Sequence, residues 1–200
     1  MKLQIGLVTQ SLVWEQICLQ EGVPFGIVDL ATKDVQEECS LLVVNRPLTE
    51  LERENVEQYL RNGGGVLGYA LYLFQVAGTN SLRERLDYIV SDHDEVFSDL
   101  HLIDLGIYGS VPREANCMRT CANTFAVFAG PLGGGFAVIL PFDAVEVLKD
   151  YRAASKNFYF TRDRLPSERV SLVSKGEVRH LLHRSFEYLH HVRGLPYAHL

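Results

Sequence analysis

The residues with the clearest potential for chemistry lie between Gly68 and Tyr72, directly after an apolar run that predicts a buried strand. A strand that turns through Gly-x-nucleophile-x-Gly lifts the central side chain clear and aims backbone N–H groups at a developing oxyanion. Here the five residues are Gly68, Tyr69, Ala70, Leu71 and Tyr72, so a methyl group stands at the nucleophile position. A methyl group cannot attack a carbonyl, and we therefore expect no catalytic residue at this turn.

A second group with the composition of a catalytic pair is His93-Asp94-Glu95, where an imidazole precedes a carboxylate. A general base must lie within hydrogen-bond reach of the proton that it removes, so position decides before residue type does. The triplet follows an apolar segment at 86–90 that we predict to be an internal strand, and it has no nucleophile to serve. We interpret it as a solvated acidic loop, and we keep His93 and Glu95 as alternative candidates for catalysis.

Ligands of open α/β sheets bind beyond the carboxyl ends of the strands, where the connections diverge. Arg46 follows one predicted end, and its guanidinium offers paired donors to an anion, although an ordinary turn with a surface arginine is an equal alternative. We expect a small polar ligand, such as a sugar, to bind at these ends. The candidate binding residues are Gln10, Asn45, Arg46, Gly68, Tyr69 and Tyr72.

The spacing of cysteine and histidine residues does not favour a metal site. Cys117 and Cys121 form C-x3-C, which differs from the usual zinc spacing and has no matching second pair, so we interpret the cysteines as reduced, mostly buried thiols. His183 and His190 share a face of the last predicted helix, but a hydrated polar face opposite an apolar stripe explains them better than a metal does. We expect no metal and no cofactor.

The elements that position these residues are clearest over residues 41–70. Four apolar residues at 41–44 predict a strand buried on both faces. Apolar residues then recur at helical spacing from Thr49, which with an acidic first turn is typical of a helix start, and Asn62-Gly63 predicts the helix end. A second apolar run at 66–69 predicts the next strand. A strand, a helix and a strand this close together form a right-handed crossover in a parallel sheet.

The predicted fold is α/β: a flavodoxin-like three-layer sandwich with a mostly parallel central sheet, an antiparallel hairpin at one edge and a C-terminal helix. The strand and helix alternation over the first seventy residues supplies four parallel strands. A glycine-rich turn joins the hairpin strands. The later predicted elements are helices at 71–76, 142–152 and 174–192, and strands at 86–90, 101–108, 124–129 and 136–140.

The composition is that of an ordinary globular domain, with 200 residues, 47% apolar residues and 22% charged residues. The formal net charge of −6 argues against a nucleic-acid partner, because phosphates would be repelled. The N-terminus lacks a signal-peptide core, and we find no run of eighteen apolar residues. We therefore expect a soluble, cytoplasmic protein with neither nucleic acid nor membrane as a partner.

Two stretches carry a resemblance to a known family. Residues 45–65, with their strand, helix and Gly-Gly turn, and the turn region 63–72 resemble class I glutamine amidotransferase-like domains, including the trehalose-utilisation-like branch. The similarity extends over about residues 1–145. That family places a cysteine in the Gly-x-Cys-x-Gly turn, whereas this chain has Ala70, and it has Tyr72 in place of the second glycine. The resemblance implies the fold without the amidotransferase chemistry.

The tail carries a further resemblance. Residues 170–200 look like the segment that leads into the catalytic barrel of polysaccharide-deacetylase-like proteins, in which an amidotransferase-like domain precedes a metal-dependent barrel. We accordingly divide the chain into a domain at 1–150 and a connecting loop and helix at 151–200. An apolar run is just beginning at 197–200, so we expect the chain to be a fragment that continues into a downstream domain.

The leading hypothesis is a non-catalytic accessory or binding domain of a larger carbohydrate-active, polysaccharide deacetylase-like protein. Its expected partners are a small polar or carbohydrate ligand and the downstream domain of the same polypeptide. One alternative is a stand-alone hydrolase or sugar-modifying enzyme that uses the same crevice, with His93 as the base. The other alternative is a dimerisation module that forms a homodimer.

Overall fold

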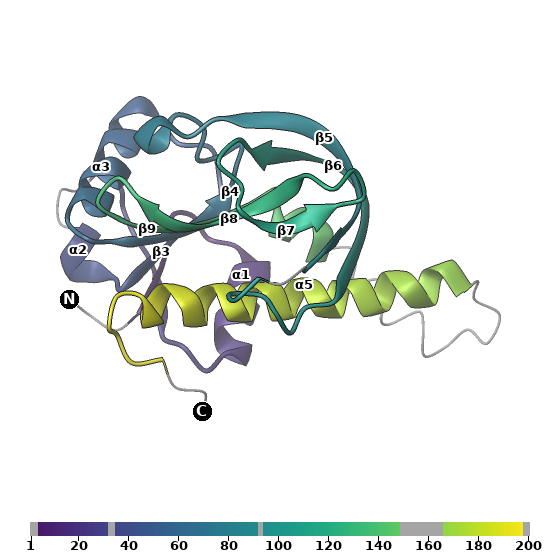
Figure 1. The fold of residues 1–200 in the computed structure, drawn as a ribbon. Helices are drawn as coiled ribbons and strands as arrows, with labels where there is room; N and C mark the ends of the chain where they lie inside the picture. Colours follow the sequence, from purple (N-terminus) through teal and green to yellow (C-terminus); the bar gives the residue numbers. More distant parts are fainter. Residues whose placement is uncertain (1–3, 32–34, 92–93, 149–165, 198–200) are drawn as a thin grey trace.

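The strands of this chain form one mixed sheet. The computed structural model describes residues 4–31, 35–91, 94–148 and 166–197 (Figure 1). Within these residues the sheet has nine strands in the order β2-β1-β3-β4-β9-β8-β7-β5-β6. In that order the strands are β2 (Phe25–Ile27), β1 (Ile5–Leu7), β3 (Leu41–Val44), β4 (Gly65–Tyr69), β9 (Gly135–Leu140), β8 (Phe125–Leu132), β7 (Cys117–Thr120), β5 (Ser81–Val90) and β6 (Leu102–Pro112).

The first half of the sheet is parallel, as the sequence predicts. Strands β2, β1, β3, β4 and β9 are parallel neighbours, so their carboxyl ends meet at one edge. The connecting helices are α1 (Leu12–Gln20), α2 (Val35–Glu38) and α3 (Glu50–Arg61). The predicted alternation of strand and helix over the first seventy residues is confirmed.

Side chains from alternate positions of β3 enter two separate cores. Leu41 and Val43 belong to a cluster with residues of α1 and α5 (Pro166–His191), whereas Leu42 and Val44 belong to a cluster with residues of α2 and α3. Successive side chains of a strand point to opposite faces, so helices cover both faces of the parallel half. The prediction of a strand buried on both faces is confirmed, because all four residues of β3 are buried.

Helix α3 begins and ends where the sequence predicts. The Thr49 hydroxyl accepts the backbone N–H of Glu52, and the Glu52 carboxylate accepts the backbone N–H of Thr49, which together form a capping box. Gly63 follows the helix with φ +82°, a conformation that glycine adopts without strain. This capping fixes how the chain leaves β3, and therefore where the end of that strand lies.

The predicted helix at 71–76 is wrong. Turns follow β4 directly, and the short 3₁₀ helix η1 (Val76–Gly78) leads into β5. Gln75 and Ala77 have φ of +68° and +48°, which no α-helix accommodates. The Thr79 hydroxyl closes this segment by donating to the Leu73 carbonyl oxygen at 2.5 Å. The strand-turn-helix geometry of a nucleophile turn is therefore absent after β4, within residues that the structure describes.

The antiparallel half is larger than predicted. The hairpin of β8 and β9 is confirmed, and its turn residues Gly133 and Gly134 have φ of +60° and +98°. This hairpin does not form an edge of the sheet, since β9 pairs with β4 and β8 pairs with β7. Antiparallel pairing then continues from β7 to β5 and from β5 to β6, which is the edge strand. The prediction of a single edge hairpin is wrong, because four antiparallel strands extend the sheet.

Strand β6 returns to the end of β9. The backbone N–H of Ser110 donates to the Pro141 carbonyl oxygen at 2.8 Å, although Pro141 lies beyond the end of β9. A Cβ added at Gly109 would lie 2.2 Å from that same oxygen, so the close approach requires glycine. Strands β5 and β6 curve round the antiparallel end of the sheet (Figure 1). This curvature places β6 beside the carboxyl ends of β4 and β9.

The C-terminal helix packs along the sheet through its predicted stripe. All six residues of that stripe have no exposed surface. His190 corrects the prediction of a hydrated histidine face, because it is 1% exposed and its ring lies 3.4 Å from the Ser40 hydroxyl and 2.8 Å from the Phe186 carbonyl oxygen. The stripe residues are Val178, Leu181, Leu182, Ser185, Phe186 and Leu189.

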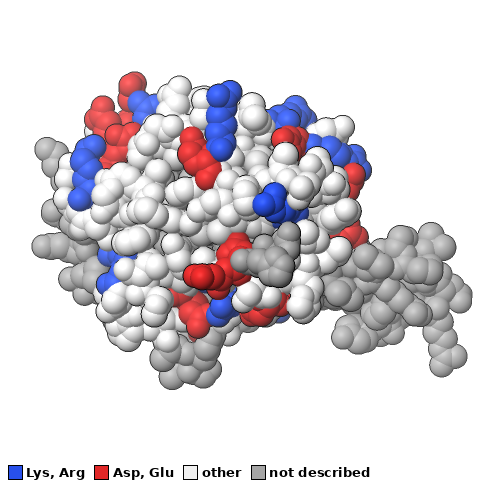
Figure 2. Space-filling view, in the orientation of Figure 1, with Lys and Arg blue, Asp and Glu red and all other residues white. Residues whose placement is uncertain are grey.

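The remaining sequence predictions concern one helix, the cysteines and the surface. Residues 144–148 are helical, as predicted, but residues 142 and 143 precede the helix, and residues 149–152 of the predicted helix lie outside the described residues. Cys121 is exposed, and the other three cysteines are buried. No helix in the described ranges is long and apolar enough to span a membrane. Acidic and basic side chains are interspersed on the face that Figure 2 shows.

Candidate functional site

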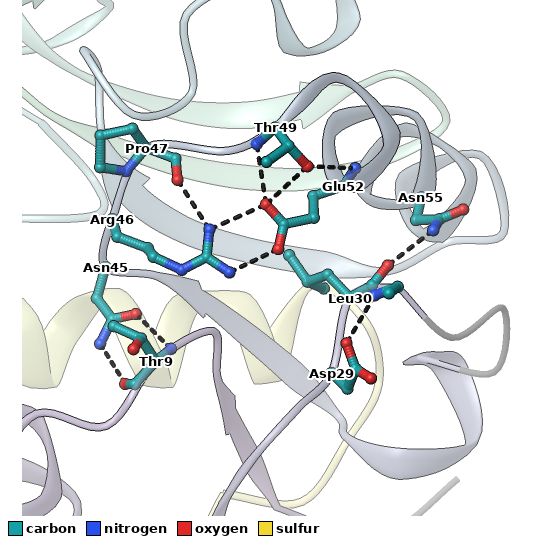
Figure 3. Close-up of polar contacts among 10 residues, drawn as sticks. Thr9, Asp29, Leu30, Asn45, Arg46, Pro47, Thr49, Glu52 and Asn55 are labelled. Atoms are coloured by element: carbon teal, nitrogen blue, oxygen red, sulfur yellow. Dashed lines mark hydrogen bonds and ion pairs between the residues drawn. The ribbon is translucent and has the colours of Figure 1, made fainter.

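Asn45, at the carboxyl end of β3, is bound to the backbone of Thr9 after β1 (Figure 3). Its Oδ1 accepts the Thr9 N–H at 3.0 Å, and its Nδ2 donates to the Thr9 carbonyl oxygen at 2.8 Å. The side-chain amide thus presents the same donor and acceptor as a peptide group, and it extends the β1–β3 pairing beyond the strands. This predicted ligand-binding residue holds two strand ends together.

Arg46 is bound to the start of α3. Its two terminal nitrogens donate to the two carboxylate oxygens of Glu52 at 2.9 and 2.6 Å, and one of them also donates to the Pro47 carbonyl oxygen at 2.9 Å (Figure 3). The hydrogen bond from Arg46 is the largest of the effects that lower the pKa of Glu52 to about 2. The positive charge of Arg46 is balanced by Glu52 within the chain. The guanidinium that was predicted to bind an anion therefore already binds the Glu52 carboxylate.

The other strand ends near α3 also carry polar contacts within the chain. Asp29 follows β2, and its carboxylate accepts the backbone N–H of Ala31 at 2.9 Å. The Asn55 amide donates to the Leu30 carbonyl oxygen at 2.7 Å (Figure 3). Gln10 is exposed to solvent after β1. The ends of β1, β2 and β3 therefore form a region stabilised largely by local polar contacts.

At the end of β4, the turn that has Ala70 at the nucleophile position is packed closely against the rest of the protein. Gly68 allows this packing, since an added Cβ would lie 2.9 Å from Leu73 Cδ1 and 3.1 Å from the Val44 carbonyl oxygen. Ala70 is 3% exposed and belongs to the core on the α3 side of the sheet. Its backbone N–H donates to the Leu140 carbonyl oxygen at 2.9 Å. The methyl group of Ala70 is thus packed in the core, and its N–H is engaged in a backbone hydrogen bond.

Tyr69 and Tyr72 meet at this turn, and both pack against the same core as Ala70. Their rings pack edge to face, with centroids 5.1 Å apart and an interplanar angle of 78°. The Tyr72 hydroxyl donates to Asp143 at 2.5 Å, and the Tyr69 hydroxyl donates to Ser110 Oγ at 3.3 Å. Burial and the hydrogen bond to Asp143 raise the pKa of Tyr72. The two tyrosines therefore connect the end of β4 with β6 and with the segment after β9.

An open cavity of about 510 Å³ lies beside Tyr69, and we call it the carboxyl-edge groove. Leu71, Phe74 and Tyr108 are its most exposed apolar residues, with 54%, 43% and 62% of their surfaces accessible. The guanidinium carbon of Arg83 lies 5.4 Å from the centre of the Tyr108 ring. The groove thus combines exposed aromatic rings, hydroxyl groups and one cation. Its lining residues are Tyr69, Leu71, Phe74, Ser81, Arg83, Tyr108, Gly109 and Ser110.

The structure separates the predicted site residues into two groups. Asn45 and Arg46 contact the loops around β1 and α3, whereas Tyr69 lines the groove and Tyr72 packs against Tyr69. Sequence reasoning missed the residues that β5 and β6 contribute, such as Arg83. The signal that could have found them is the alternation of arginine along β5, which places these side chains on one face of a strand.

The alternative catalytic candidates lie elsewhere. His93 falls outside the described residues. Glu95 is exposed and lines a separate cavity of about 360 Å³ with residues of α5, including Arg184, Glu187 and His191. Among the residues that the structure describes, no group of histidine, cysteine, aspartate and glutamate side chains is arranged to hold a metal ion.

No family model matches this sequence, and no curated protein matches it. Among solved structures, the exo-β-1,4-mannosidase Op5Man5 from Opitutaceae bacterium strain TAV5 is similar with a TM-score of 0.58 and 11% identity, over 77% of this chain and 34% of that one. The cytoplasmic protein STM1381 from Salmonella typhimurium LT2 is similar with a TM-score of 0.54 and 10% identity, over 72% of this chain and 89% of that one.

A ThuA-like protein from Bacteroides uniformis ATCC 8492 is also among these neighbours, with a TM-score of 0.47 and 13% identity, over 72% of this chain and 84% of that one. The chain spans about a third of the length of the glycosidases that it matches. At identities near 10%, the similarities to the mannosidase and to the Salmonella protein establish a shared α/β fold and nothing further.

Proposed function

We propose that this chain is a non-catalytic, amidotransferase-like accessory domain that binds a small carbohydrate ligand in the carboxyl-edge groove. The observation that carries the proposal is the pairing of exposed aromatic rings with hydroxyl groups at the carboxyl edge of the sheet. Open α/β sheets bind ligands at this edge. The groove thus combines the usual position of a ligand site with a surface of mixed polarity.

The groove has the two kinds of surface that a sugar ring needs. A pyranose has an apolar face of C–H groups that packs on an aromatic ring, and it has a rim of hydroxyl groups that require hydrogen-bond partners. Tyr108 offers the ring, and the Arg83 and Arg85 guanidinium carbons each lie 5.4 Å from its centre. Ser81 and Ser110 supply hydroxyl groups on the lining.

Two features of the β4 turn support a binding role over a catalytic one. Ala70 has no reactive group, and its methyl is buried. The Tyr72 hydroxyl is engaged with Asp143, and burial together with that contact raises its pKa, which disfavours a phenolate nucleophile. Both observations support the expectation that this chain has the amidotransferase-like fold but no amidotransferase activity.

We also propose that the chain is related to amidotransferase-like domains and that it is part of a larger carbohydrate-active protein. Helices on both faces of the parallel half fit a flavodoxin-like sandwich, which supports descent from an amidotransferase-like domain. The similarity to about a third of a mannosidase supports an accessory position within a larger carbohydrate-active protein. A polysaccharide deacetylase-like parent remains a prediction from residues 170–200, and sequencing the encoding gene on both sides tests it.

Isothermal titration calorimetry tests the binding proposal. The purified chain is titrated with glucose, galactose, mannose and N-acetylglucosamine, and we expect saturable binding of at least one of them. Tyr108→Ala should weaken that binding about tenfold, the size of one aromatic packing contact. Tyr88→Ala is the matched control, because Tyr88 is 38% exposed on β5 and does not line the groove. The proposal would be refuted if neither these four sugars nor the corresponding uronic acids, glucuronate and galacturonate, bound.

A further inference from the structure

Arg83 is placed in the groove by the pairing of β5 with β6. The register sets Arg83 opposite Ser110 and Arg85 opposite Tyr108, so the four side chains share one face of the two strands. Arg83 and Ser110 line the carboxyl-edge groove, whereas Arg85 does not. The two arginines are equivalent neighbours of the Tyr108 ring, but they differ in access to the groove.

The two arginines also differ in charge balance. Arg85 forms an ion pair with Asp87, with 2.8 Å between Nε and Oδ1. In the described part of the chain, no carboxylate forms an ion pair with Arg83, whose contact is with the Tyr108 ring. Every other lining residue is uncharged at neutral pH. The groove therefore carries one uncompensated positive charge on a chain whose net charge is −6.

A guanidinium offers two parallel donors that match a carboxylate, and such charge-assisted pairs are stronger than hydrogen bonds between neutral groups. The aromatic and hydroxyl lining meanwhile suits a sugar ring. A hexuronic acid carries both features, because its carboxylate is attached to the ring. We propose that the groove selects an acidic sugar, with Arg83 binding its carboxylate and Tyr108 packing on its ring. This inference rests on the proposed function and narrows its ligand class.

The test compares acidic sugars with neutral sugars of the same ring. The chain is titrated calorimetrically with glucuronate and galacturonate, and with glucose and galactose, at low and high salt. We expect the matching uronate to bind at least tenfold more tightly than its neutral counterpart. Salt should weaken the binding of the uronate and leave that of the neutral sugar unchanged, since it screens the charge interaction.

Arg83→Gln should reduce the affinity for the uronate to that for the neutral sugar, and Arg83→Lys should restore part of the difference. Arg119→Gln is the matched control, because the Arg119 guanidinium carbon lies 4.0 Å from the centre of the Phe125 ring and Arg119 does not line the groove, and it should change both affinities by less than twofold. Circular dichroism establishes that each variant folds. The inference is refuted if Arg83→Gln weakens neutral and acidic sugars equally, or if Arg119→Gln has the same effect as Arg83→Gln.

The outcomes separate this inference from the proposed function. Equal binding of neutral and acidic sugars that depends on Tyr108 would uphold the binding function and refute the acidic preference. Binding of glucose 6-phosphate without binding of either uronate would also refute the carboxylate assignment. If no sugar of either kind binds, the binding function and the inference both fail.

Discussion

Asn45 binds both backbone polar groups of Thr9, so one side-chain amide extends the pairing of β1 and β3 beyond the last backbone hydrogen bond. A peptide group has the same donor and acceptor as an amide side chain, which is why asparagine can act in this way. The polar residues at the end of an α/β strand therefore need not face a ligand. In this chain the ends of β1 and β3 are linked to each other, and the end of β4 borders the groove.

Asn45→Ala should lower the free energy of unfolding by about 1–3 kcal/mol, because the N–H and carbonyl of Thr9 would lose their partners at a partly buried site. Urea denaturation measures the loss. Gln10→Ala is the control, since Gln10 is exposed after β1, next to Thr9, and its replacement should change stability by less than about 0.5 kcal/mol. Equal effects of the two variants would contradict a structural role for Asn45.

The parallel half could be predicted because its signals are local. The run at 41–44 and the caps of α3 are each encoded within a few residues. Strand β5 was only partly predicted, because three of its first five residues are charged and these five residues show no apolar stripe. Strand β7 was missed because it has only four residues. Its two apolar residues, Cys117 and Met118, are adjacent and do not alternate with polar residues.

The candidate site was predicted in part for the same reason. Tyr69 is the last residue of an obvious strand, and it does lie at the groove. Arg83 reaches the groove through the register that pairs it with Ser110, and no local periodicity encodes that pairing. For Arg46 the sequence predicts either an anion-binding residue or a surface arginine at a turn, and neither alternative identifies Glu52 as its partner, because the cap of α3 is what brings the two together.

Stability should depend on acid through Glu52. Its pKa in the folded chain is about 2, compared with an ordinary value of 4.5, so the unfolded chain binds the proton more readily. The contribution of Glu52 to stability is therefore present above about pH 4.5 and is lost as the pH falls towards 2. Denaturation of wild type and Glu52→Gln should differ most at neutral pH and converge as the pH approaches the folded-state pKa of about 2. Glu54→Gln, at an exposed position of α3, should show no such convergence.

Gly68→Ala should destabilise the chain by about 1–3 kcal/mol, the usual cost of forcing an extra methyl into a packed site. The new Cβ would lie 2.9 Å from Leu73 and 3.1 Å from the backbone oxygen of Val44. Gly26→Ala is the control, since the nearest atom to its added Cβ is a Gln4 side-chain nitrogen at 3.4 Å. Thermal denaturation compares them, and an unchanged melting temperature for Gly68→Ala would show that this turn has room.

One thiol should react rapidly in the folded chain. Cys121 is exposed, whereas burial raises the pKa of Cys39 to about 11 and that of Cys18 to about 12, and it also raises the pKa of Cys117. The thiolate is the reactive form, so the buried groups should react only after denaturation. Titration with an aromatic disulfide should release one equivalent natively and four in denaturant. Cys121→Ser should abolish the rapid phase, and its persistence would mean that a buried thiol is accessible.

Introducing a cysteine at position 70 should not produce a reactive nucleophile. The Ala70 methyl is 3% exposed, and it lies in the core between the sheet and α3, so a sulfur attached there would enter an apolar environment. Burial raises the pKa of a thiol and slows its reaction. The Ala70→Cys change is made in the Cys121→Ser background, and the aromatic disulfide again measures reactivity. We expect no rapid phase and a modest loss of stability from overpacking. A rapid phase from the introduced thiol would show that the turn presents this position to solvent, as a nucleophile turn does, and it would contradict the packing role that the structure assigns to Ala70.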